Sequence, residues 1–455
     1  MLVVISDLHL TDGTTGTTIA ADAFTIFAER VRDMAFSASW RTDGIYRPLE
    51  EIHLVLLGDI FDHLLTTQWV PRPGNPAINP WDDPNTPAFV NHIRNITRAI
   101  LQHNASSFRI LRRMSSGEQI SLPQATRNHR PAYNAPRQPV PVRIYYMVGN
   151  HDWYFHLPGN AYDAIRAEVI QALGLQNAVT PFPHEQEHAP ALHRLCTDHG
   201  VYLRHGDIYD GFNYDHTKGR NAATLGDAIV VGLVNRFPVE VQRRYGDEFP
   251  ADFIAGLSEI ANVRPNLLVP VWIDALMRKT CSPAQQQVIK ALWDELADDF
   301  LANPFVRAQD TIHPADRVDF MQTVLRLSQL TSLRSFSHLA RTFYEKFWDG
   351  DVSFKRHALQ ERAIREGFAR YVVYGHTHLP EIVPLDVYTL SADNRLMQMY
   401  FNSGTWHTIH DMVLAETRHA KFIPHHTMTF LAFFQGDERK GRPYETWTGA
   451  LGWKG

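Results

Sequence analysis

Short apolar runs recur along the chain, and each of them ends abruptly in polar or glycine-rich residues. Each run is too short for a free-standing helix and is rich in branched or aromatic residues, which is typical of a buried strand. The runs are residues 2–5, 52–57, 144–148, 201–203, 371–374 and 397–401. We therefore predict a buried strand at each of these places.

Between these runs, apolar residues recur with the period of an α-helix. Phe24, Phe27 and Val31 fall on one helical face, and Thr86 followed by proline is typical of a helix start. Residues 160–174 begin with an asparagine suited to the N-cap and end with a glycine suited to the C′ position. Strands alternating with helices favour an α/β fold in which the helices pack on the sheet.

The segment 217–350 has a different pattern, with little strand and much helix, including the helix start Ser282-Pro283. We predict a helical insertion or cap here. It would separate a first core part, residues 1–216, from a second core part, residues 351–436, and a polar C-terminal tail would follow at 437–455. Two stretches rich in Pro, Asn and Arg, residues 66–85 and 116–141, are expected to be long surface loops.

Composition narrows the class of protein. The chain has 455 residues, of which 44% are hydrophobic and 20% charged, as in globular proteins with more than one domain. The formal net charge is −5 without a long Lys/Arg run, which argues against a nucleic-acid groove.

Cys196 and Cys281 are far apart and outside any CxxC pattern, so we expect reduced thiols. No secretory signal pattern or apolar run of ~18 residues is present, so we expect a cytoplasmic protein.

The candidate chemistry lies in the polar residues that directly follow the predicted strands. Ligands of open α/β sheets bind at the carboxyl ends of strands, so these clusters are expected to converge on one place. The clusters are Asp7-Leu8-His9, Gly58-Asp59-Ile60-Phe61-Asp62, Gly149-Asn150-His151-Asp152, His205-Gly206-Asp207 and Gly375-His376-Thr377-His378.

The clusters offer carboxylates, imidazoles and one amide oxygen, but no thiolate. Such mixed N/O ligands suit divalent ions such as Mn, Fe, Zn or Mg. Two ions about 3.5–4 Å apart need a bridging ligand, for which a carboxylate with two oxygens is well suited. Each motif alone is a weak signal, whereas five of them in order, each after a strand, predict a binuclear metal site.

In this order, the five motifs resemble those of the calcineurin-like metallophosphoesterase superfamily. The His-Gly-Asp form of the fourth motif and the segment 400–406, YFNSGTW, are most similar to its bacterial branch that includes UDP-2,3-diacylglucosamine pyrophosphohydrolase. The resemblance covers residues 1 to about 215 and about 368 to 434, but not the helical insertion, which is larger than that branch leads us to expect. It implies a four-layer α/β/β/α sandwich and two bound divalent ions, with Mn favoured.

The resemblance also implies a role for each motif residue. One metal would be bound by Asp7, His9 and His378, the second by Asn150, His205 and His376, and Asp59 would bridge the two. His151 would act as an acid toward the leaving oxygen or stabilise the phosphoryl group, and Asp62 would orient His151. These residues together would hydrolyse a phosphate ester or pyrophosphate bond with metal-activated water.

Several functional alternatives stay open at this point. A nuclease of the same superfamily would need a basic groove, and a catalytically silent metal-binding scaffold would be expected to lack some of the motif residues. The expected partner is a phosphorylated small molecule or a lipid-linked substrate, and peripheral contact with a membrane is left open. The insertion could form a cap, a dimer interface or structural bulk, and we favour a cap because it lies between two metal motifs.

Other polar residues near the motifs have simpler interpretations. We expect His63 in a solvated turn or in a hydrogen bond behind a metal ligand, and Asp12 in a turn. Asp152 is expected to bond to nearby backbone, and strand alternation points Arg204 away from His205. Whether His407 lines the pocket is left open.

Overall fold

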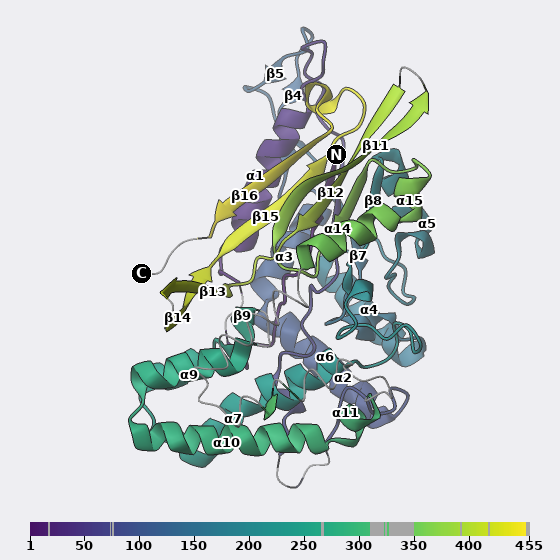
Figure 1. Cartoon of the computed structure of the whole chain (residues 1–455). Helices are drawn as coiled ribbons and strands as arrows, with labels where there is room; N and C mark the ends of the chain where they lie inside the picture. Colours follow the sequence, from purple (N-terminus) through teal and green to yellow (C-terminus); the bar gives the residue numbers. More distant parts are fainter. Residues whose placement is uncertain are drawn as a thin grey trace.

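The chain forms a mixed α/β structure. This computed structural model describes residues 1–16, 19–72, 74, 77–264, 268–309, 323, 325–326, 350–391, 394–416 and 419–451. Two sheets carry the candidate motifs, and a separate group of helices from the insertion lies beside them (Figure 1).

The first sheet has the strand order β16-β15-β1-β2-β7. Its central strands β1, β2 and β7 are parallel, while β15 and β16 are antiparallel additions at one side. The strands are β1 (Leu2–Ile5), β2 (Ile52–Leu57), β7 (Val142–Met147), β15 (Thr427–Phe433) and β16 (Tyr444–Ala450).

The second sheet has the strand order β11-β12-β10-β8. Strands β8, β10 and β12 are parallel, and β11 pairs with β12 in the antiparallel direction. The strands are β8 (Val201–Leu203), β10 (Tyr371–Tyr374), β11 (Pro380–Ser391) and β12 (Asn394–Ser403). Strands β1, β2, β8 and β10 are almost entirely apolar and buried, as strands covered on both faces must be.

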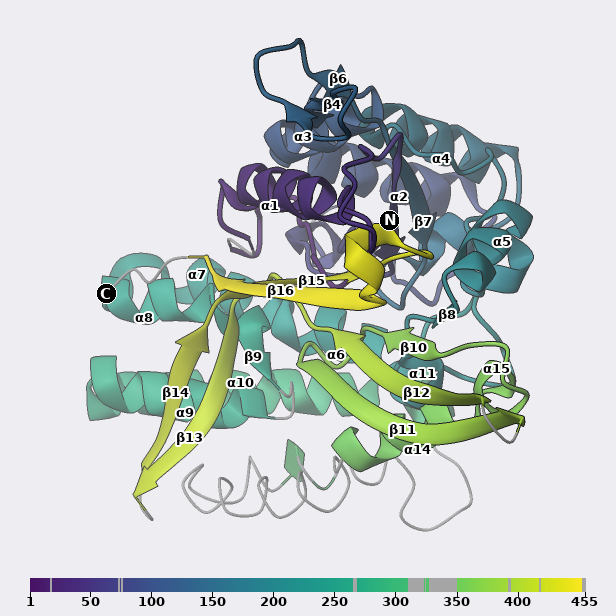
Figure 2. The same ribbon diagram turned by 90° about the horizontal axis from the view of Figure 1, so that it is seen from above.

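Alternate residues of each strand belong to different cores. One face of the first sheet and one face of the second share a single apolar cluster, which includes Val4, Val55, Val373 and Phe401. The opposite face of the first sheet packs with α1–α4, and the opposite face of the second packs with α14 and α15. Figure 2 shows α1–α4 on one side of β15 and β16, with β10–β12 and α14 on the other.

The helices that cover the sheets begin and end at recognisable residues. They are α1 (Ala23–Ala38), α2 (Pro87–His103), α3 (Ala105–Ser115), α4 (Asn160–Leu173), α5 (Pro190–Asp198), α14 (Gly350–Gln360) and α15 (Arg362–Arg365). The Thr86 side chain accepts a hydrogen bond from Phe89 N at the start of α2, as the Thr-Pro pair predicts. Gly174 adopts the left-handed conformation that ends α4, whereas the N-cap of α4 is Gly159 rather than Asn160.

The described part of the insertion is mostly helical, as predicted. It contains α6 (Leu225–Ile229), a π-helix (Val230–Val234), α7 (Arg236–Tyr245), α8 (Ala251–Leu257), α9 (Val269–Thr280), α10 (Pro283–Ala302) and α11 (Pro304–Ala308). The remainder of the predicted insertion, residues 265–267 and 310–349 apart from 323, 325 and 326, lies outside the described residues.

A third sheet ties the insertion to the second core part. Strand β9 (Val263–Arg264) pairs in parallel with β13 (Ile409–Glu416), which pairs with β14 (His419–His425). The pairing places Val263 and Arg264 beside His410 and Asp411, near the start of β13. A two-residue strand in the insertion therefore reaches the region where the motif residues lie.

Two expected irregular segments are partly regular. Residues 444–450, expected in a polar tail, instead form β16, because Trp447 stacks on Phe430 and Tyr444 packs against Phe401. The expected loop at 116–141 holds two short antiparallel pairs. These are β3 (Ser121–Leu122) with β6 (Gln138–Pro139), and β4 (Gln124–Ala125) with β5 (Pro131–Ala132). The boundaries between domains stay predictions.

A capping box stabilises the start of α10. Ser282 Oγ accepts from Gln285 N, and the Gln285 side chain accepts from Ser282 N at 2.9 Å, which forms a capping box. We expect Ser282→Ala to lower the free energy of unfolding by about 0.5–2 kcal/mol, measured by urea denaturation followed by circular dichroism. The control Ser116→Ala, at the C-cap of α3, should change it less; equal effects would contradict the assigned cap.

Candidate metal centre

Each predicted ligand directly follows a strand. Asp7 and His9 follow β1, Asp59 follows β2, and Asn150 follows β7; His205 follows β8, and His376 and His378 follow β10. Because β1, β2 and β7 are parallel, as are β8 and β10, the carboxyl ends within each sheet lie at one edge. The structure brings all seven predicted ligands, together with His151 and Asp62, into one cluster, in which all but His151 and His376 are buried.

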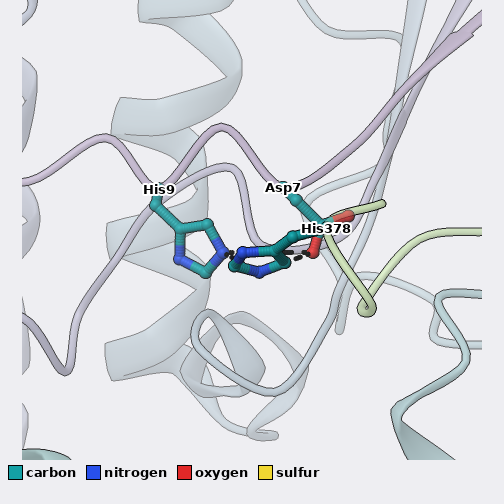
Figure 3. A group of neighbouring side chains, drawn as sticks. All are labelled: Asp7, His9 and His378. Atoms are coloured by element: carbon teal, nitrogen blue, oxygen red, sulfur yellow. Dashed lines mark hydrogen bonds and ion pairs between the residues drawn. The ribbon is translucent and has the colours of Figure 1, made fainter. Parts of the chain in front are cut away.

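The first group of ligand atoms comes from Asp7, His9 and His378 (Figure 3). His9 Nε2 lies 3.0 Å from His378 Nε2, and His378 Nε2 lies 3.5 Å from Asp7 Oδ1. The third side of the triangle, from His9 Nε2 to Asp7 Oδ1, is 3.9 Å. These separations match the edges of a coordination shell whose metal–ligand bonds are about 2.0–2.2 Å.

The second group consists of Asp59, His205 and His376, with Asn150 beside it. His205 Nε2 lies 3.2 Å from Asp59 Oδ2, and His376 Nδ1 lies 3.0 Å from Asn150 Oδ1. The amide nitrogen of Asn150 donates to Asn213 Oδ1 at 3.3 Å, which turns the amide oxygen toward the imidazole. The candidate ligand atoms of this group are therefore two imidazole nitrogens, a carboxylate oxygen and an amide oxygen.

Asp59 lies between the two groups. Its Oδ2 atom is 3.8 Å from His9 Nε2 in the first group and 3.2 Å from His205 Nε2 in the second. Its Oδ1 atom accepts from the backbone N–H of His151 at 2.8 Å, which fixes the plane of the carboxylate. This is the position that a bridging carboxylate must occupy.

Asp62 contacts His151, as predicted, and also contacts His9. One carboxylate oxygen lies 2.9 Å from His151 Nδ1, and the other lies 2.8 Å from His9 Nδ1. Asp62 also accepts from the backbone N–H groups of Leu64 and Leu65. The carboxylate therefore orients both imidazoles, so that Nε2 of each faces the site.

Charge and burial shift the pKa values of the cluster in opposite directions. Burial raises the pKa of Asp7, whereas at Asp59 the nearby His205 and His151 outweigh burial and hold the pKa well below its usual range. Burial opposes protonation of His205, but Asp59 and Asp7 raise its pKa to about 10. In the metal-free protein His205 is thus protonated at neutral pH, and metal binding would displace that proton.

The backbone is strained where the ligands lie. Of the eight described non-glycine residues with φ in the left-handed region, five are candidate ligands, namely Asp7, His9, Asp59, His376 and His378. Bulky residues avoid this region, at a cost of about 1–2 kcal/mol each. Such residues cluster at functional sites, where the surrounding structure holds them in place.

Two glycines let the backbone pass close to the ligands. A Cβ atom at Gly149 would meet a carboxylate oxygen of Asp59 and lie 2.7 Å from His205 Nε2. A Cβ atom at Gly375 would meet the carboxylate of Asp7. Neither position can accept a side chain without moving a candidate ligand.

The residues present fit a pair of divalent cations. His9 Nε2 and His378 Nε2 face each other at 3.0 Å, and His205 Nε2 faces Asp59 Oδ2 at 3.2 Å. Asp7 and Asp59, both almost completely buried, repel each other electrostatically. Cations placed among these atoms would satisfy the lone pairs and compensate the two negative charges.

Two residues of the site were not predicted from the sequence. Asp210 Oδ2 lies 3.1 Å from His376 Nε2, and Arg264 Nε donates to His378 Nδ1 at 3.3 Å. Asp210 could have been suspected because it lies three residues after the His-Gly-Asp motif. Arg264 comes from β9 in the insertion, and no local pattern links it to the motifs.

The simpler interpretations of nearby residues are mostly confirmed. Asp152 accepts from the backbone N–H groups of Ile60 and Gly149, and Asp12 accepts from the backbone N–H of Thr14 in a turn. Arg204 pairs with Glu185 and Glu361, away from the site.

Two further histidines near the motifs are buried. His63 is not in a solvated turn: its Nε2 atom lies 3.0 Å from Thr97 Oγ1, and its ring packs against Phe61 and Phe155. His407 lies beside the first ligand group, with its ring 5.8 Å from that of His9. Burial lowers the pKa of His407 well below its usual range.

No protein-family model and no curated protein matches this sequence. Across the described part of the chain, every helix is too short or too polar to cross a bilayer. The assignment of the site therefore depends on its own geometry and chemistry.

The central position of Asp59 predicts its effect on metal content. Asp59→Asn removes the charge that both groups share, so we expect loss of most bound Mn²⁺ from metal-loaded protein, measured by inductively coupled plasma mass spectrometry after dialysis. The control Asp437→Asn removes an exposed carboxylate that pairs with Arg41 and Arg47 and should leave metal content unchanged. Wild-type metal content in Asp59→Asn would show that Asp59 is not a metal ligand.

Proposed function

We propose that this chain is a binuclear metal-dependent phosphoesterase that hydrolyses a phosphate ester or a pyrophosphate bond. The observation that carries the proposal is the position of Asp59 between two groups of nitrogen and oxygen ligands. Two divalent ions bound there would lower the pKa of a shared water and neutralise charge on the phosphoryl oxygens. The described residues around the ligands supply the other groups that such a reaction needs.

His151 is suited to protonate the leaving oxygen. Asp62 holds its Nδ1 atom, which leaves Nε2 to face the site. Burial opposes protonation, but the charges of Asp62 and Asp59 raise the pKa of His151 to about 9. The metal-free site therefore keeps this imidazole protonated at neutral pH, ready to give a proton to an alkoxide-like leaving group.

Arg264 is suited to bind the phosphoryl group. Burial lowers its pKa to about 10 despite the nearby carboxylates of Asp62, Asp7 and Asp59, so the guanidinium is cationic at neutral pH. A guanidinium recognises phosphate oxygens through a planar fork of N–H donors.

The bond between Arg264 and His378 would change when metal binds. Arg264 now donates to His378 Nδ1, and a neutral imidazole has only one acceptor nitrogen. When His378 Nε2 ligates a metal, Nδ1 carries the proton and no longer accepts from Arg264. Metal binding would thus make the Nε–H of Arg264 available to a substrate, while Nη1 keeps its bonds to the backbone carbonyls of Ala261 and Val263.

The arrangement of the sheets supports the same family of enzymes. Two facing sheets with helices on both outer sides agree with the four-layer α/β/β/α sandwich that the resemblance to calcineurin-like metallophosphoesterases implies. We propose that fold, Mn as the favoured metal, a phosphorylated small molecule or lipid-linked substrate, and a cytoplasmic location. The net charge of −5 does not favour a nuclease, which would need a basic groove. The intact set of candidate ligands does not favour a catalytically silent scaffold, which would be expected to lack some of them.

The direct test is hydrolysis of p-nitrophenyl phosphate and bis-p-nitrophenyl phosphate by metal-stripped protein with Mn²⁺, Mg²⁺, Zn²⁺ or no metal restored. We expect metal-dependent release of nitrophenol that is lost in Asp59→Asn and retained in Asp437→Asn. Two bound ions per chain without hydrolysis of either compound or of a pyrophosphate diester would favour the scaffold.

The role of His151 predicts a dependence on the leaving group. We expect His151→Ala to keep its metals but to lower kcat about 10²–10⁴-fold for phenyl phosphate, whose leaving group needs a proton. The loss should be smaller for p-nitrophenyl phosphate, whose leaving group is stable as an anion. An equal loss for both substrates, or loss of the metals, would refute the assignment as an acid.

The role of Arg264 predicts a change in phosphate binding. We expect Arg264→Ala to raise KM and the inhibition constant of inorganic phosphate by about tenfold, which corresponds to ~1.4 kcal/mol of binding free energy. Arg264→Lys, which keeps the charge but not the fork, should fall between Arg264→Ala and wild type. The control Arg98→Ala removes an exposed arginine paired with Glu168 and should leave KM and the inhibition constant of phosphate unchanged. Unchanged phosphate inhibition in Arg264→Ala would contradict the assigned role.

A further inference from the structure

A second cluster of metal-ligating side chains lies outside the groups around Asp59. His184, Glu185 and His188 each offer one ligand atom, and these atoms lie within 4.8 Å of one another. They belong to the segment between α4 and α5, where Gln186–His188 forms a 3-10 turn. None of the three contributes to the ligand groups of the proposed phosphoesterase site.

A chain of hydrogen bonds sets the tautomer of His184. Asn221 Oδ1, which can only accept, lies 2.7 Å from His156 Nδ1, so that nitrogen carries the proton. The other nitrogen of His156, Nε2, then accepts from His184 Nδ1 at 3.2 Å. His184 is left with an unprotonated Nε2, the form in which an imidazole binds a metal.

Glu185 is oriented in a similar way. Its Oε1 atom accepts from an Arg204 guanidinium nitrogen at 2.8 Å, while Oε2 lies 3.8 Å from His188 Nε2. Arg204 is itself held by Glu361, which contacts the hydroxyl groups of Tyr209 and Tyr374. One carboxylate oxygen is thus fixed by a charged partner, and the other faces the imidazole.

We propose that His184, Glu185 and His188 bind a single divalent transition-metal ion of the zinc class, with His156 orienting His184 from behind. Two imidazoles and one carboxylate are a common protein ligand set for zinc, with a fourth position left to water. The half-exposed setting of the cluster gives the ion access from solvent, since His188 is 55% exposed and Glu185 is 31% exposed.

The sequence carries a signal for this site in the spacing His-Glu-x-x-His. In zinc proteases this spacing lies on an α-helix, which places both imidazoles on one face and keeps the glutamate as a general base. Here the segment forms only a 3-10 turn, and Glu185 joins the imidazoles as a ligand. The geometry therefore points to zinc binding rather than to peptidase activity.

The test measures zinc bound to the full chain by inductively coupled plasma mass spectrometry after metal stripping, loading with Zn²⁺ and dialysis. His184→Ala and His188→Ala are compared with His103→Ala, which removes an exposed histidine at the end of α2. The series is repeated in the Asp59→Asn background, so that zinc bound near Asp59 is counted separately. Thermal unfolding followed by circular dichroism checks that each variant is folded.

We expect His184→Ala and His188→Ala to lose one equivalent of zinc in both backgrounds, while His103→Ala loses none. Hydrolysis of p-nitrophenyl phosphate should be unchanged in the three histidine variants. His188→Cys, which replaces one zinc ligand by another, should retain the ion and give a thiolate–cobalt charge-transfer band when loaded with Co²⁺. Unchanged zinc content in His184→Ala and His188→Ala, or absence of that band in His188→Cys, would overturn the proposal.

Discussion

The burial of two neighbouring carboxylates, Asp7 and Asp59, is the constraint on which the rest of the site depends. Removing an ionised carboxylate from water costs several kcal/mol unless positive charge compensates it. In the metal-free protein that compensation comes from imidazoles, above all His205, whose pKa the carboxylates raise to about 10. Divalent cations among the same atoms would compensate the charge more completely and leave the ligating imidazoles, such as that of His205, neutral.

The fold is arranged to hold these charged groups where the strands end. Parallel strands from two facing sheets deliver ligands from opposite sides, and the backbone adopts left-handed conformations at five of them. Gly149 and Gly375 leave room for the carboxylates, and Asp62 fixes the rings of His9 and His151. The left-handed backbone conformations and the absence of side chains at the two glycines lower stability locally. Burial of the apolar cluster between the sheets offsets that loss.

Much of the fold and the site could be predicted from local patterns. Strands β1, β2, β8 and β10 have the predicted bounds, and the residues after them meet as expected, because strand ends follow from short apolar runs. Arg264 could not be predicted, since β9 has only two residues and its partner β13 lies far along the chain. Strand β16 could not be predicted, because the polar residues Glu445, Thr446 and Thr448 around Trp447 give no sign of its stacking on Phe430.

The site joins three distant parts of the sequence, and only two of them carry recognisable motifs. The two core parts contribute the ligands, while the insertion contributes Arg264 and the buried Asn235, which donates to the backbone of Leu64 and Thr66. These contacts place the insertion beside the second motif. If the chain has the proposed function, variation in the insertion would change substrate recognition without changing the candidate ligands.

The pair of metal ions around Asp59 is tested most directly by an anomalous difference map from crystals of the full chain loaded with Mn²⁺, collected at the manganese absorption edge. We predict two peaks about 3.5–4 Å apart, one among Asp7, His9 and His378 and the other beside His205 and His376, with Asp59 between them. A single peak in this cluster, or peaks that Asp59 does not contact, would contradict this prediction.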